Sequence, residues 1–278
     1  MIKVIQPGLY SNIQDYGRFG YRNIGVPYSG FMDQESARTA NKIVGNDENE
    51  SLIEITLMGP TLLFNADYIL SITGADFSSL INNDKVDMYK PIHVKLGDTL
   101  KINHSKYGAR CYLAISGGID VKSILGSKSS FKGITSSYFL KKGDEIKIIS
   151  NNKSNFNFDC KSVFNIVSNL NVTEGPEFNM LNKDSLDMLF NKKFTIGVNN
   201  RMAYNLNEKL QVGSKSIISS PVLPGTVQLT PSGNIIVLHR DCQVSGGYLR
   251  ILQLNEKSLN YLSQLKTGQI VKFKLISK

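Results

Sequence analysis

Tryptophan is absent from the sequence, and cysteine and histidine each occur only three times in 278 residues. Cys111, Cys160 and Cys242 are widely spaced and form no C-x-x-C pair, so no disulfide framework is expected. The histidines are equally scattered, and no pair has the spacing of a metal site. We therefore expect no metal in the protein, and the unpaired cysteines favour a reducing cytoplasm.

Long apolar runs are absent as well. No segment approaches the roughly 18 uncharged apolar residues that a membrane-spanning helix needs. Met1–Tyr10 has a strand-like pattern in place of the basic, apolar and small-residue regions of a signal peptide, so no such peptide is expected. The hydrophobic fraction of 41% excludes a mainly disordered chain. These observations predict a globular protein with no membrane partner.

The formal charge of +9 does not predict a nucleic-acid interface. Twenty-five of the 32 basic residues are lysines, and only Lys141-Lys142 and Lys192-Lys193 are adjacent in sequence. Nucleic-acid binders concentrate basic residues on one face and use arginine for bidentate contacts. We interpret the lysines as a solvated basic surface and expect no nucleic-acid partner.

Most of the chain reads as short strands separated by Gly, Asn, Asp and Pro. A spacing of about ten residues with little helix between strands favours barrels or sandwiches over a parallel α/β sheet. The expected strands are Lys3–Leu9, Thr61–Phe64, Tyr68–Thr73, His93–Leu96, Thr99–Asn103, Arg110–Ser116, Glu145–Ile149, Val163–Val167, Thr226–Thr230, Ile235–His239, Leu249–Leu254 and Ile270–Ile276.

Three helices are expected between these strands. Ser29–Val44 has an apolar face and ends before Gly45, which is a suitable C-terminal stop. Ser185–Phe190 is short, with Asp184 as its predicted N-cap. Glu256–Leu265 carries leucines at i, i+3 and i+6, a spacing that indicates one buried face.

A domain boundary is predicted in Ser150–Lys161, where Asn, Lys and Ser dominate and periodicity fades. It divides the chain into residues 1–150 and 151–278. Both parts contain a Gly-Ser-Lys-Ser segment, at Gly126–Ser129 and Gly213–Ser216. Matches this short arise easily by chance, so they leave the question of a duplicated fold open.

Several standard catalytic motifs are absent. Gly126–Ser129 lacks the upstream glycine of a phosphate-binding loop, and Gly117-Gly118 opens no long helix of the kind that binds dinucleotides. The sequence has no G-x-S-x-G nucleophile elbow and no Met-Lys-Met segment of the sort that carries biotin. These absences argue against a phosphate-binding loop, a dinucleotide site, a serine hydrolase of this type and covalently bound biotin in this chain.

Polar side chains gather in glycine-rich loops near the N-terminus. Gln14–Gly20 places an amide, a carboxylate and the Arg18 guanidinium between glycines, where Arg18 either binds an anion or pairs with the neighbouring aspartate. Gly25–Asp33 leads into the first expected helix. Its backbone N–H groups either form an anion seat or are capped by Ser29 and Asp33.

Further clusters follow at strand ends. Thr73–Asp76 ends an apolar strand with a carboxylate that is either functional or part of an Asx-turn. Arg110 begins an otherwise apolar strand, so we expect it to have a partner, either Asp120 or a ligand. In Asp241–Tyr248, two glycines either form a wall around a small planar substrate or a hairpin bulge; we favour the substrate.

An ordered series of motifs runs from about Ile5 to Phe273, and it is weakest between Ser150 and Asn200. The motifs are Gln14-Asp15-x-Gly17-Arg18-x-Gly20, Gly25-Val26-Pro27-x-Ser29-Gly30-x-Met32-Asp33, Ala40-Asn41-x-x-Val44-Gly45-Asn46, Glu54-Ile55-Thr56-x-x-Gly59-Pro60, Thr73-Gly74-Ala75-Asp76, Arg110-x-Tyr112-Leu113-Ala114-x-x-Gly117-Gly118-Ile119-Asp120-Val121, Leu125-Gly126-Ser127-Lys128-Ser129, Arg201-Met202, Pro224-Gly225-Thr226-Val227-Gln228, Asp241-x-Gln243-x-x-Gly246-Gly247-Tyr248 and Gln264-Leu265. In this order and spacing the series resembles the carboxyltransferase subdomain A/B family, also called the allophanate hydrolase subunit 2 or KipA family.

The sequence departs from the family pattern at a few positions. Asn205 stands where the family usually has an arginine, which removes one anion contact and leaves the identity of the substrate open. Leu249 and Thr267 replace prolines that stiffen the backbone in the family.

The resemblance implies a mainly β fold with two cyclophilin-like β-barrel domains and a few short helices. It implies a role as the C subunit of an ATP-dependent 5-oxoprolinase, which opens the 5-oxoproline lactam to glutamate. The partners it implies are a KipI-like B subunit together with a LamB/YcsF-like A subunit, with ATP and Mg used by the complex. A lactam is a poor electrophile, and phosphorylation of its oxygen would supply a leaving group.

Site residues follow from the motifs and the resemblance together. We expect arginines to bind anions, carboxylates to handle protons or hydrogen bonds, and Gln228 to recognise the lactam. His239 adjoins a motif but is expected to be structural. The predicted catalytic residues are Asp76, Asp241 and Arg110, and the predicted substrate-binding residues are Gln14, Arg18, Ser29, Arg201, Gln228, Gly246, Gly247 and Tyr248. Arg18→Gln and Asp241→Asn are expected to reduce turnover without unfolding the chain.

Two other functions fit the same resemblance. One is a biotin-dependent carboxyltransferase component of a urea carboxylase or allophanate pathway, which would receive carboxyl groups from biotin on another chain. The other is a non-catalytic, KipA-like regulator that binds a KipI-like inhibitor of a sensor kinase.

Overall fold

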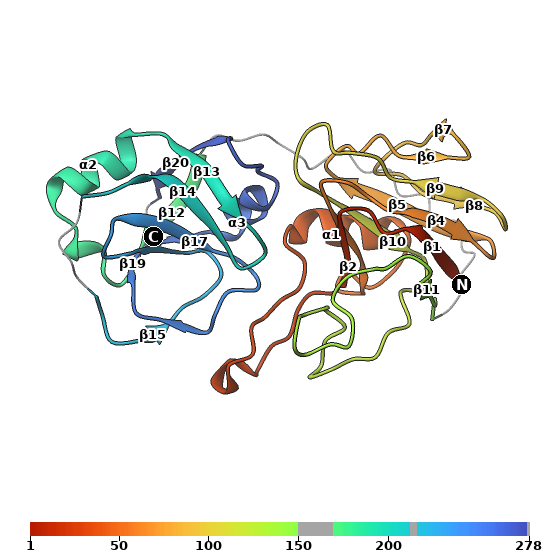
Figure 1. Cartoon of the computed structure of the whole chain (residues 1–278), viewed down its shortest axis with the longest axis horizontal. Helices are drawn as coiled ribbons and strands as arrows, with labels where there is room; N and C mark the ends of the chain where they lie inside the picture. Colours follow the sequence, from red (N-terminus) through yellow and green to blue (C-terminus); the bar gives the residue numbers. More distant parts are fainter. Residues whose placement is uncertain (150–168, 212–215, 277–278) are drawn as a thin grey trace. The chain divides into compact units, whose positions relative to one another are not determined.

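The computed structural model describes residues 1–149, 169–211 and 216–276, and its elements form two units (Figure 1). The first unit comprises Met1–Arg18 and Ser29–Asn165, and the second comprises Phe19–Tyr28 and Ile166–Lys278. The expected boundary at residues 150 and 151 lies outside the described residues. So do Cys160 and the expected strand Val163–Val167.

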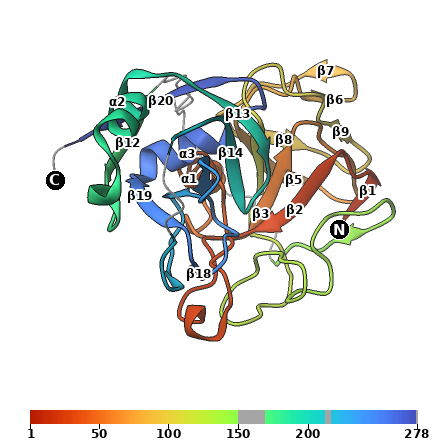
Figure 2. The same ribbon diagram turned by 60° about the vertical axis from the view of Figure 1, so that its left-hand side comes forward.

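A short segment near the N-terminus belongs to the second unit. Phe19–Tyr28, which contains the 3₁₀-helix η1 (Arg22–Ile24), leaves the first unit after Arg18, and the chain returns to it at Ser29. It is the red loop with one short helical turn in Figure 2. A division of the chain at one point would assign this segment to the first domain, and the structure assigns it to the second.

The first unit contains two antiparallel sheets. The six-stranded sheet has the order β11-β1-β4-β9-β6-β7, and the five-stranded sheet has the order β2-β3-β10-β5-β8. The strands are β1 (Ile2–Gln6), β2 (Tyr10–Gln14), β3 (Leu52–Thr56), β4 (Thr61–Phe64), β5 (Tyr68–Gly74), β6 (Leu80–Ile81), β7 (Asp84–Lys85), β8 (Ile92–Val94), β9 (Thr99–Lys101), β10 (Arg110–Ile115) and β11 (Glu145–Ile146).

Strand β10 is buried on both faces because it lies in the middle of the five-stranded sheet. Cys111 and Leu113 point into the core that this sheet shares with the six-stranded sheet. Tyr112 and Ala114 point to the opposite face, where they pack against helix α1 (Gln34–Ile43). Side chains alternate between the faces of a strand, so this position between two cores explains why β10 is apolar from Cys111 to Ile115.

Helix α1 begins one turn later than the sequence predicts. Asp33 is its N-cap, and the Asp33 carboxylate accepts a hydrogen bond from the Ser36 N–H at 3.1 Å. Ala37 and Ala40 face the five-stranded sheet, and these small side chains allow the helix backbone to approach it closely. The Asp33 N–H also donates to the Tyr112 hydroxyl at 2.7 Å, which fixes the start of the helix against β10.

The second unit is a closed barrel with the strand order β12-β19-β16-β17-β14-β13-β20, in which β20 closes onto β12 in parallel. A separate pair, β15 and β18, forms a two-stranded sheet. The strands are β12 (Asn169–Glu174), β13 (Phe194–Asn199), β14 (Ala203–Lys209), β15 (Ser220–Pro221), β16 (Thr226–Leu229), β17 (Asn234–Leu238), β18 (Ser245–Gly246), β19 (Leu249–Leu254) and β20 (Ile270–Leu275). The helical elements are η2 (Phe178–Met180), α2 (Lys183–Asn191) and α3 (Glu256–Ser263).

The expected mainly β class with a few short helices is confirmed. The N-cap of α2 was predicted wrongly: Asn182 accepts the Ser185 N–H at 2.8 Å, and Asp184 lies inside the first turn. The prediction of Asp184 placed the helix start too late, because the apolar face becomes visible only from Ser185 onward. Over the described ranges, none of the helices is long and apolar enough to cross a membrane.

Candidate functional site

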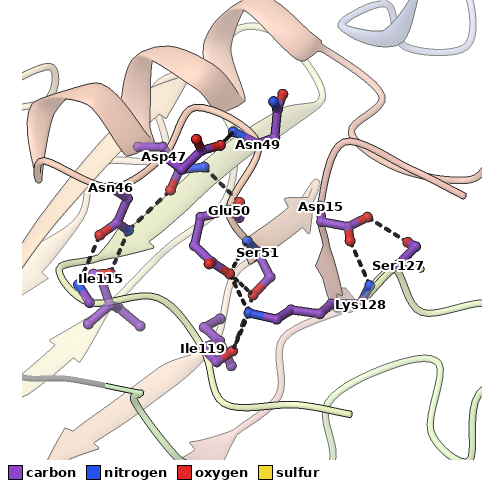
Figure 3. A network of polar contacts seen from close by, with 12 residues as sticks. Asp15, Asn46, Asp47, Asn49, Glu50, Ser51, Ile115, Ile119, Ser127 and Lys128 are labelled. Atoms are coloured by element: carbon purple, nitrogen blue, oxygen red, sulfur yellow. Dashed lines mark hydrogen bonds and ion pairs between the residues drawn. The ribbon is translucent and has the colours of Figure 1, made fainter. Parts of the chain in front are cut away.

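Asp15 organises the Gly126–Ser129 loop of the first unit (Figure 3). Its carboxylate accepts hydrogen bonds from the Ser127 hydroxyl at 2.7 Å, the Ser129 hydroxyl at 2.5 Å and the Lys128 N–H at 2.6 Å. The Gly17 N–H donates a fourth, at 2.9 Å. A carboxylate that receives this many donors fixes the loop that surrounds it.

The same hydrogen bonds decide whether the loop fits a phosphate group. The Lys128 N–H donates to Asp15, and the Ser129 N–H donates to the Ser127 hydroxyl at 3.0 Å. A phosphate placed here would face a carboxylate in the position where a phosphate-binding loop offers open N–H groups. Gly126–Ser129 therefore does not fit the phosphates of ATP.

Gln14 and Arg18 hold neighbouring loops together. The Gln14 amide donates to the Ser130 carbonyl at 3.1 Å and accepts the Gly30 N–H at 3.1 Å. Arg18 is 0% exposed, and its Nε and Nη2 donate to the carbonyls of Ile124 and Ser129 at 3.0 and 2.9 Å. Gln14 and Arg18, which were both predicted to bind substrate, therefore stabilise the loops around them.

The loop before α1 was predicted either to seat an anion or to be capped, and the structure favours capping. The Gly30, Met32 and Asp33 N–H groups donate to Gln14 Oε1, Glu54 Oε2 and the Tyr112 hydroxyl respectively. These N–H groups are therefore engaged by protein acceptors. Asp33 caps the helix as this alternative predicted, but Ser29 does not: it is buried with a positive φ of 57°, and its hydroxyl has no hydrogen-bond partner among the described residues.

Arg110 pairs with Glu54, a motif residue that was not predicted to be its partner. Its Nε lies 3.8 Å from Oε1 of Glu54 on β3, and both side chains are buried. The alternative partner Asp120 is exposed. Burial, and next the charge of Glu54, raise the pKa of the adjacent Tyr112 well above its ordinary value. This phenol is therefore protonated and neutral at physiological pH.

Asp76 forms the Asx-turn that was the alternative to a functional role. Its carboxylate accepts the Ser78 N–H at 2.7 Å, and the residue is only partly buried. Burial first, and the charge of Asp76 second, raise the pKa of the Cys111 thiol well above its ordinary value. Cys111 is therefore held as an unreactive thiol.

Lys128 forms the centre of a polar network in the first unit (Figure 3). Its Nζ lies 2.6 Å from Glu50 Oε1 and donates to the Ile119 carbonyl at 3.3 Å. The Ser51 N–H and hydroxyl donate to the same Glu50 oxygen at 2.7 and 2.8 Å. A small pocket of about 210 Å³ lies beside these groups.

In the second unit, Arg201 and Asp241 form a buried bidentate ion pair. Arg201 Nε and Nη2 donate to the two Asp241 carboxylate oxygens at 2.9 and 3.0 Å. The Asp241 N–H also donates to the Arg201 carbonyl at 3.0 Å. The two residues were predicted to contact substrate separately, and the structure brings them together instead.

Gln228 and Gly246 approach each other closely. Gln228 is buried on β16, and its Oε1 accepts a hydrogen bond from the Gln243 amide at 3.3 Å. Its Nε2 has no hydrogen-bond partner among the described residues. A Cβ at Gly246 would lie 2.7 Å from that nitrogen, so the Gln228 amide would have to shift if this residue carried a side chain. The glycine therefore leaves room for an unpaired amide donor.

Gly247 and Tyr248 continue the same loop toward the surface. The Gly247 carbonyl accepts the Ile217 N–H at 3.1 Å. Tyr248 is 42% exposed, and of the predicted substrate-binding residues in this unit it is the most accessible. This part of the unit combines a buried amide donor with an exposed aromatic ring.

The segment Phe19–Tyr28 is anchored beside this loop, a feature that the sequence analysis missed. Arg22 donates to the backbone carbonyls of Val222 and Val244, and its guanidinium lies 4.7 Å from the centre of the Tyr28 ring. Burial raises the pKa of the nearby Cys242 thiol to about 11, although Arg22 opposes the shift. The sequence carries no signal for this anchoring, because the carbonyls that Arg22 contacts lie about two hundred positions away in the chain.

His239 has the structural role expected for it. It is fully buried, its Nδ1 accepts the Arg240 N–H at 2.9 Å, and its Nε2 is 3.1 Å from the Leu259 carbonyl. Because a backbone N–H can only donate, the hydrogen of the neutral ring is on Nε2. No group of three or more metal-ligating side chains occurs in the part of the chain that the structure describes.

Comparison with known proteins places the chain in a family. The model of the carboxyltransferase domain, subdomain A and B, matches residues 24–275. The chain belongs to this family. The match crosses both units and includes most of the motifs described above.

Individual relatives differ in how much of their length the chain covers. The C subunit of the 5-oxoprolinase of Escherichia coli K12 is 32% identical over 282 residues, which span 98% of this chain and 90% of the relative. The urea amidolyase of Saccharomyces cerevisiae is 37% identical over 224 residues, which span 74% of this chain and 12% of that protein. The solved urea carboxylase of Kluyveromyces lactis is 29% identical with a TM-score of 0.90, over 99% of this chain and 27% of that one.

The solved relatives are larger proteins. The chain spans 19–56% of five solved chains that resemble it, each with a TM-score of 0.89 or 0.90. Its fold is therefore one part of those chains, whereas it matches nearly the whole of the E. coli protein.

Proposed function

We propose that this chain is the C subunit of an ATP-dependent 5-oxoprolinase, the complex that opens the 5-oxoproline lactam to glutamate. The observation that supports this most strongly is the length of the match: 98% of this chain aligns with 90% of the corresponding E. coli 5-oxoprolinase chain. A second bacterial relative with the same name, from Haemophilus influenzae, aligns over 100% of this chain and 92% of its own length.

The proposal includes two partner chains, a KipI-like B subunit together with a LamB/YcsF-like A subunit. The relatives' designation as one subunit supports a reaction shared among several chains. Gly126–Ser129 does not fit the phosphates of ATP, because Asp15 occupies its donors. We therefore assign ATP and Mg to the complex and not to this loop.

Among the predicted site residues, Gln228 and Tyr248 have the geometry that best suits contact with substrate. A lactam offers a carbonyl acceptor, and the Gln228 Nε2 is a buried donor without a partner among the described residues. Tyr248 adds an exposed ring on the same loop as Gly246 and Gly247. For Gln14, Arg18, Asp76, Arg110, Arg201 and Asp241, we propose that they shape the site by holding its loops. Ser29, whose buried hydroxyl has no partner among the described residues, stays a predicted substrate contact.

Reconstitution tests the proposed reaction. The three purified subunits are combined with 5-oxoproline, ATP and Mg, and glutamate is measured, with each chain omitted in turn. We expect glutamate only when all three chains and ATP are present. Absence of glutamate from the complete mixture would reject the proposal. If this chain nevertheless bound the KipI-like protein, the regulatory function would become the better account.

A carboxyltransferase function is the second candidate, supported by the family description and by the 37% identity to yeast urea amidolyase. A carboxyltransferase would move a carboxyl group from biotin, whereas a 5-oxoprolinase opens a lactam. Labelled bicarbonate, ATP, biotin carboxylase and a biotin carrier are supplied together with this chain, and labelled carboxylated product is measured. Transfer that depends on the carrier would favour this candidate over the lactam reaction.

A further inference from the structure

A larger pocket, of about 480 Å³, lies in the first unit and has no role in the contacts described so far. Ile13 of β2 and side chains from residues 121–140 line it. Pockets of about 300–1,000 Å³ that are mostly apolar with a few polar groups are the usual form of small-molecule sites. Ile13, Ile124, Phe139 and Leu140 supply the apolar wall here.

Two lysines bring positive charge to this pocket. Lys128 lines both this pocket and the smaller polar one, and its side chain is 21% exposed. Two of its three N–H bonds are directed at Glu50 and the Ile119 carbonyl, which leaves one for a ligand. Lys122 is exposed at the same pocket and makes no ion pair with another described residue.

Hydroxyl groups complete the polar lining. Ser130 and Ser136 line the pocket, and neither hydroxyl makes a hydrogen bond to another residue of the described ranges. A hydroxyl both donates and accepts, so these two serines can bind a carboxylate oxygen or an amide of a ligand. The pocket therefore offers two cations and two hydroxyls against an apolar wall.

The charges set the class of ligand. Lys122 and Lys128 are balanced by Glu50, which pairs with Lys128, and by the Asp15 carboxylate, which accepts hydrogen bonds only from neutral groups, so these four residues carry no net charge. A monocarboxylate would bring one uncompensated negative charge to this partly buried site and a dianion two, and each uncompensated charge is costly where water is partly excluded. A singly charged carboxylate fits better than a phosphate monoester.

The loop that carries Lys128 is also held in place before any ligand arrives. Asp15 binds the backbone of Lys128 and the hydroxyls of the serines on either side of it. A binding group that is already positioned loses little conformational entropy when it contacts a ligand. This arrangement is favourable for a small ligand with few contacts.

We propose that this pocket binds a small monocarboxylate with an apolar body, whose carboxylate lies between Lys122 and Lys128 and whose body lies against Ile13 and Phe139. Its lining residues are different from Gln228 and Tyr248, which we propose contact the lactam in the reaction. The ligand can come from two sources: 5-oxoproline, if the proposed function holds, or another acid of the same size and charge that controls the complex.

The test is a ligand-detected NMR titration of the full chain with three probes. 5-Oxoproline and cyclopentanecarboxylate share a carboxylate on a five-membered ring, and 2-pyrrolidinone has the lactam without the carboxylate. We expect at least one carboxylate to bind, and 2-pyrrolidinone to bind at least about tenfold more weakly, since a hydrogen-bonded charge is lost. Lys122→Met should weaken carboxylate binding about fivefold, as expected for a partly exposed charge pair.

Lys142→Met provides the matched control, because Lys142 is exposed and does not line the pocket. Glu50→Gln should strengthen carboxylate binding, since it removes the negative charge beside Lys128. Binding of cyclopentanecarboxylate without 5-oxoproline would support the pocket and identify a different acid as its ligand. The proposal is overturned if neither acid binds, if 2-pyrrolidinone binds equally well, or if Lys122→Met and Lys142→Met behave alike.

Discussion

At the scale of single residues, the charged groups of the motifs are largely held by other parts of the protein. Arg18 donates to two backbone carbonyls, and Arg201 and Asp241 bind each other. The sequence shows which residues are charged, but not which acceptor lies at the far end of a long side chain. The expectation that Asp241→Asn spares the fold therefore needs revision.

Asp241→Asn should lower the free energy of unfolding by about 3–5 kcal/mol, because it leaves the buried Arg201 guanidinium without its counter-ion. Urea denaturation of the isolated chain measures this. Asp187→Asn is a suitable control, because Asp187 is exposed and bonds only to Asn191 among the described residues. Equal stability of the two variants would show that the Arg201 pair contributes little.

A second ion pair makes the stability of the chain depend on pH. Arg250 donates from Nε and Nη2 to Glu177 at 2.9 and 2.7 Å, and these hydrogen bonds lower the pKa of Glu177 below its ordinary value. A carboxylate with a lowered folded-state pKa stabilises the native state above its unfolded pKa of about 4.3. That stabilisation is lost as the pH falls through the folded-state pKa.

Glu177→Gln should therefore be less stable than the natural sequence by about 2 kcal/mol at pH 7, and the difference should shrink as the pH falls below about 4. Urea denaturation at pH 7 and pH 3 compares the two chains. Glu174→Gln, at an exposed position on β12, should change little. If the stability difference between Glu177→Gln and the natural sequence grew as the pH fell, the lowered pKa could not belong to Glu177.

At the scale of elements, the sequence predicted some apolar strands with their bounds, whereas the apolar strand β3 was not predicted. Thr61–Phe64 and Leu249–Leu254 were predicted with the bounds that β4 and β19 have. β14 was missed because Ala203–Lys209 contains asparagine, glutamate and lysine, which have low strand propensity. Its pairing with β13 and β17 overrides that propensity, and such long-range pairing is not visible in a single sequence.

The corrected start of α2 gives an element-scale prediction. Asn182→Ala should lower the free energy of unfolding by about 1 kcal/mol, because it removes the acceptor for the Ser185 N–H. Asp184→Ala, two residues later, should cost only a few tenths of a kcal/mol through the helix dipole. Thermal denaturation of both variants compares the positions. A larger loss for Asp184→Ala would restore the original prediction.

At the scale of the whole molecule, the chain passes from the first unit to the second and back before α1 begins. No compositional change marks Phe19–Tyr28, so its membership of the second unit was not predictable from the sequence. Its assignment depends on contacts with residues some two hundred positions away, of which Arg22 makes several. The candidate site shows the same limit. The sequence showed where the motifs lie along the chain, but not which motif residues contact each other.

Arg22→Ala should release this segment. Loss of the hydrogen bonds to the Val222 and Val244 carbonyls and of the Tyr28 contact should speed amide exchange in Phe19–Tyr28 by about tenfold. Hydrogen–deuterium exchange with mass spectrometry measures this. Arg38→Ala removes a similar contact with the Tyr16 ring in the first unit and should leave exchange in Phe19–Tyr28 unchanged. Equal exchange in the Arg22 variant and the natural chain would refute the anchoring role.

The central claim is that this chain is an essential part of a 5-oxoprolinase. The measurement that tests it most directly is the rate of glutamate release from 5-oxoproline by the purified three-protein mixture, with and without this chain. The account predicts ATP-dependent release that disappears when this chain is left out. Release at the same rate without it, or no release when all three proteins and ATP are present, would contradict the account.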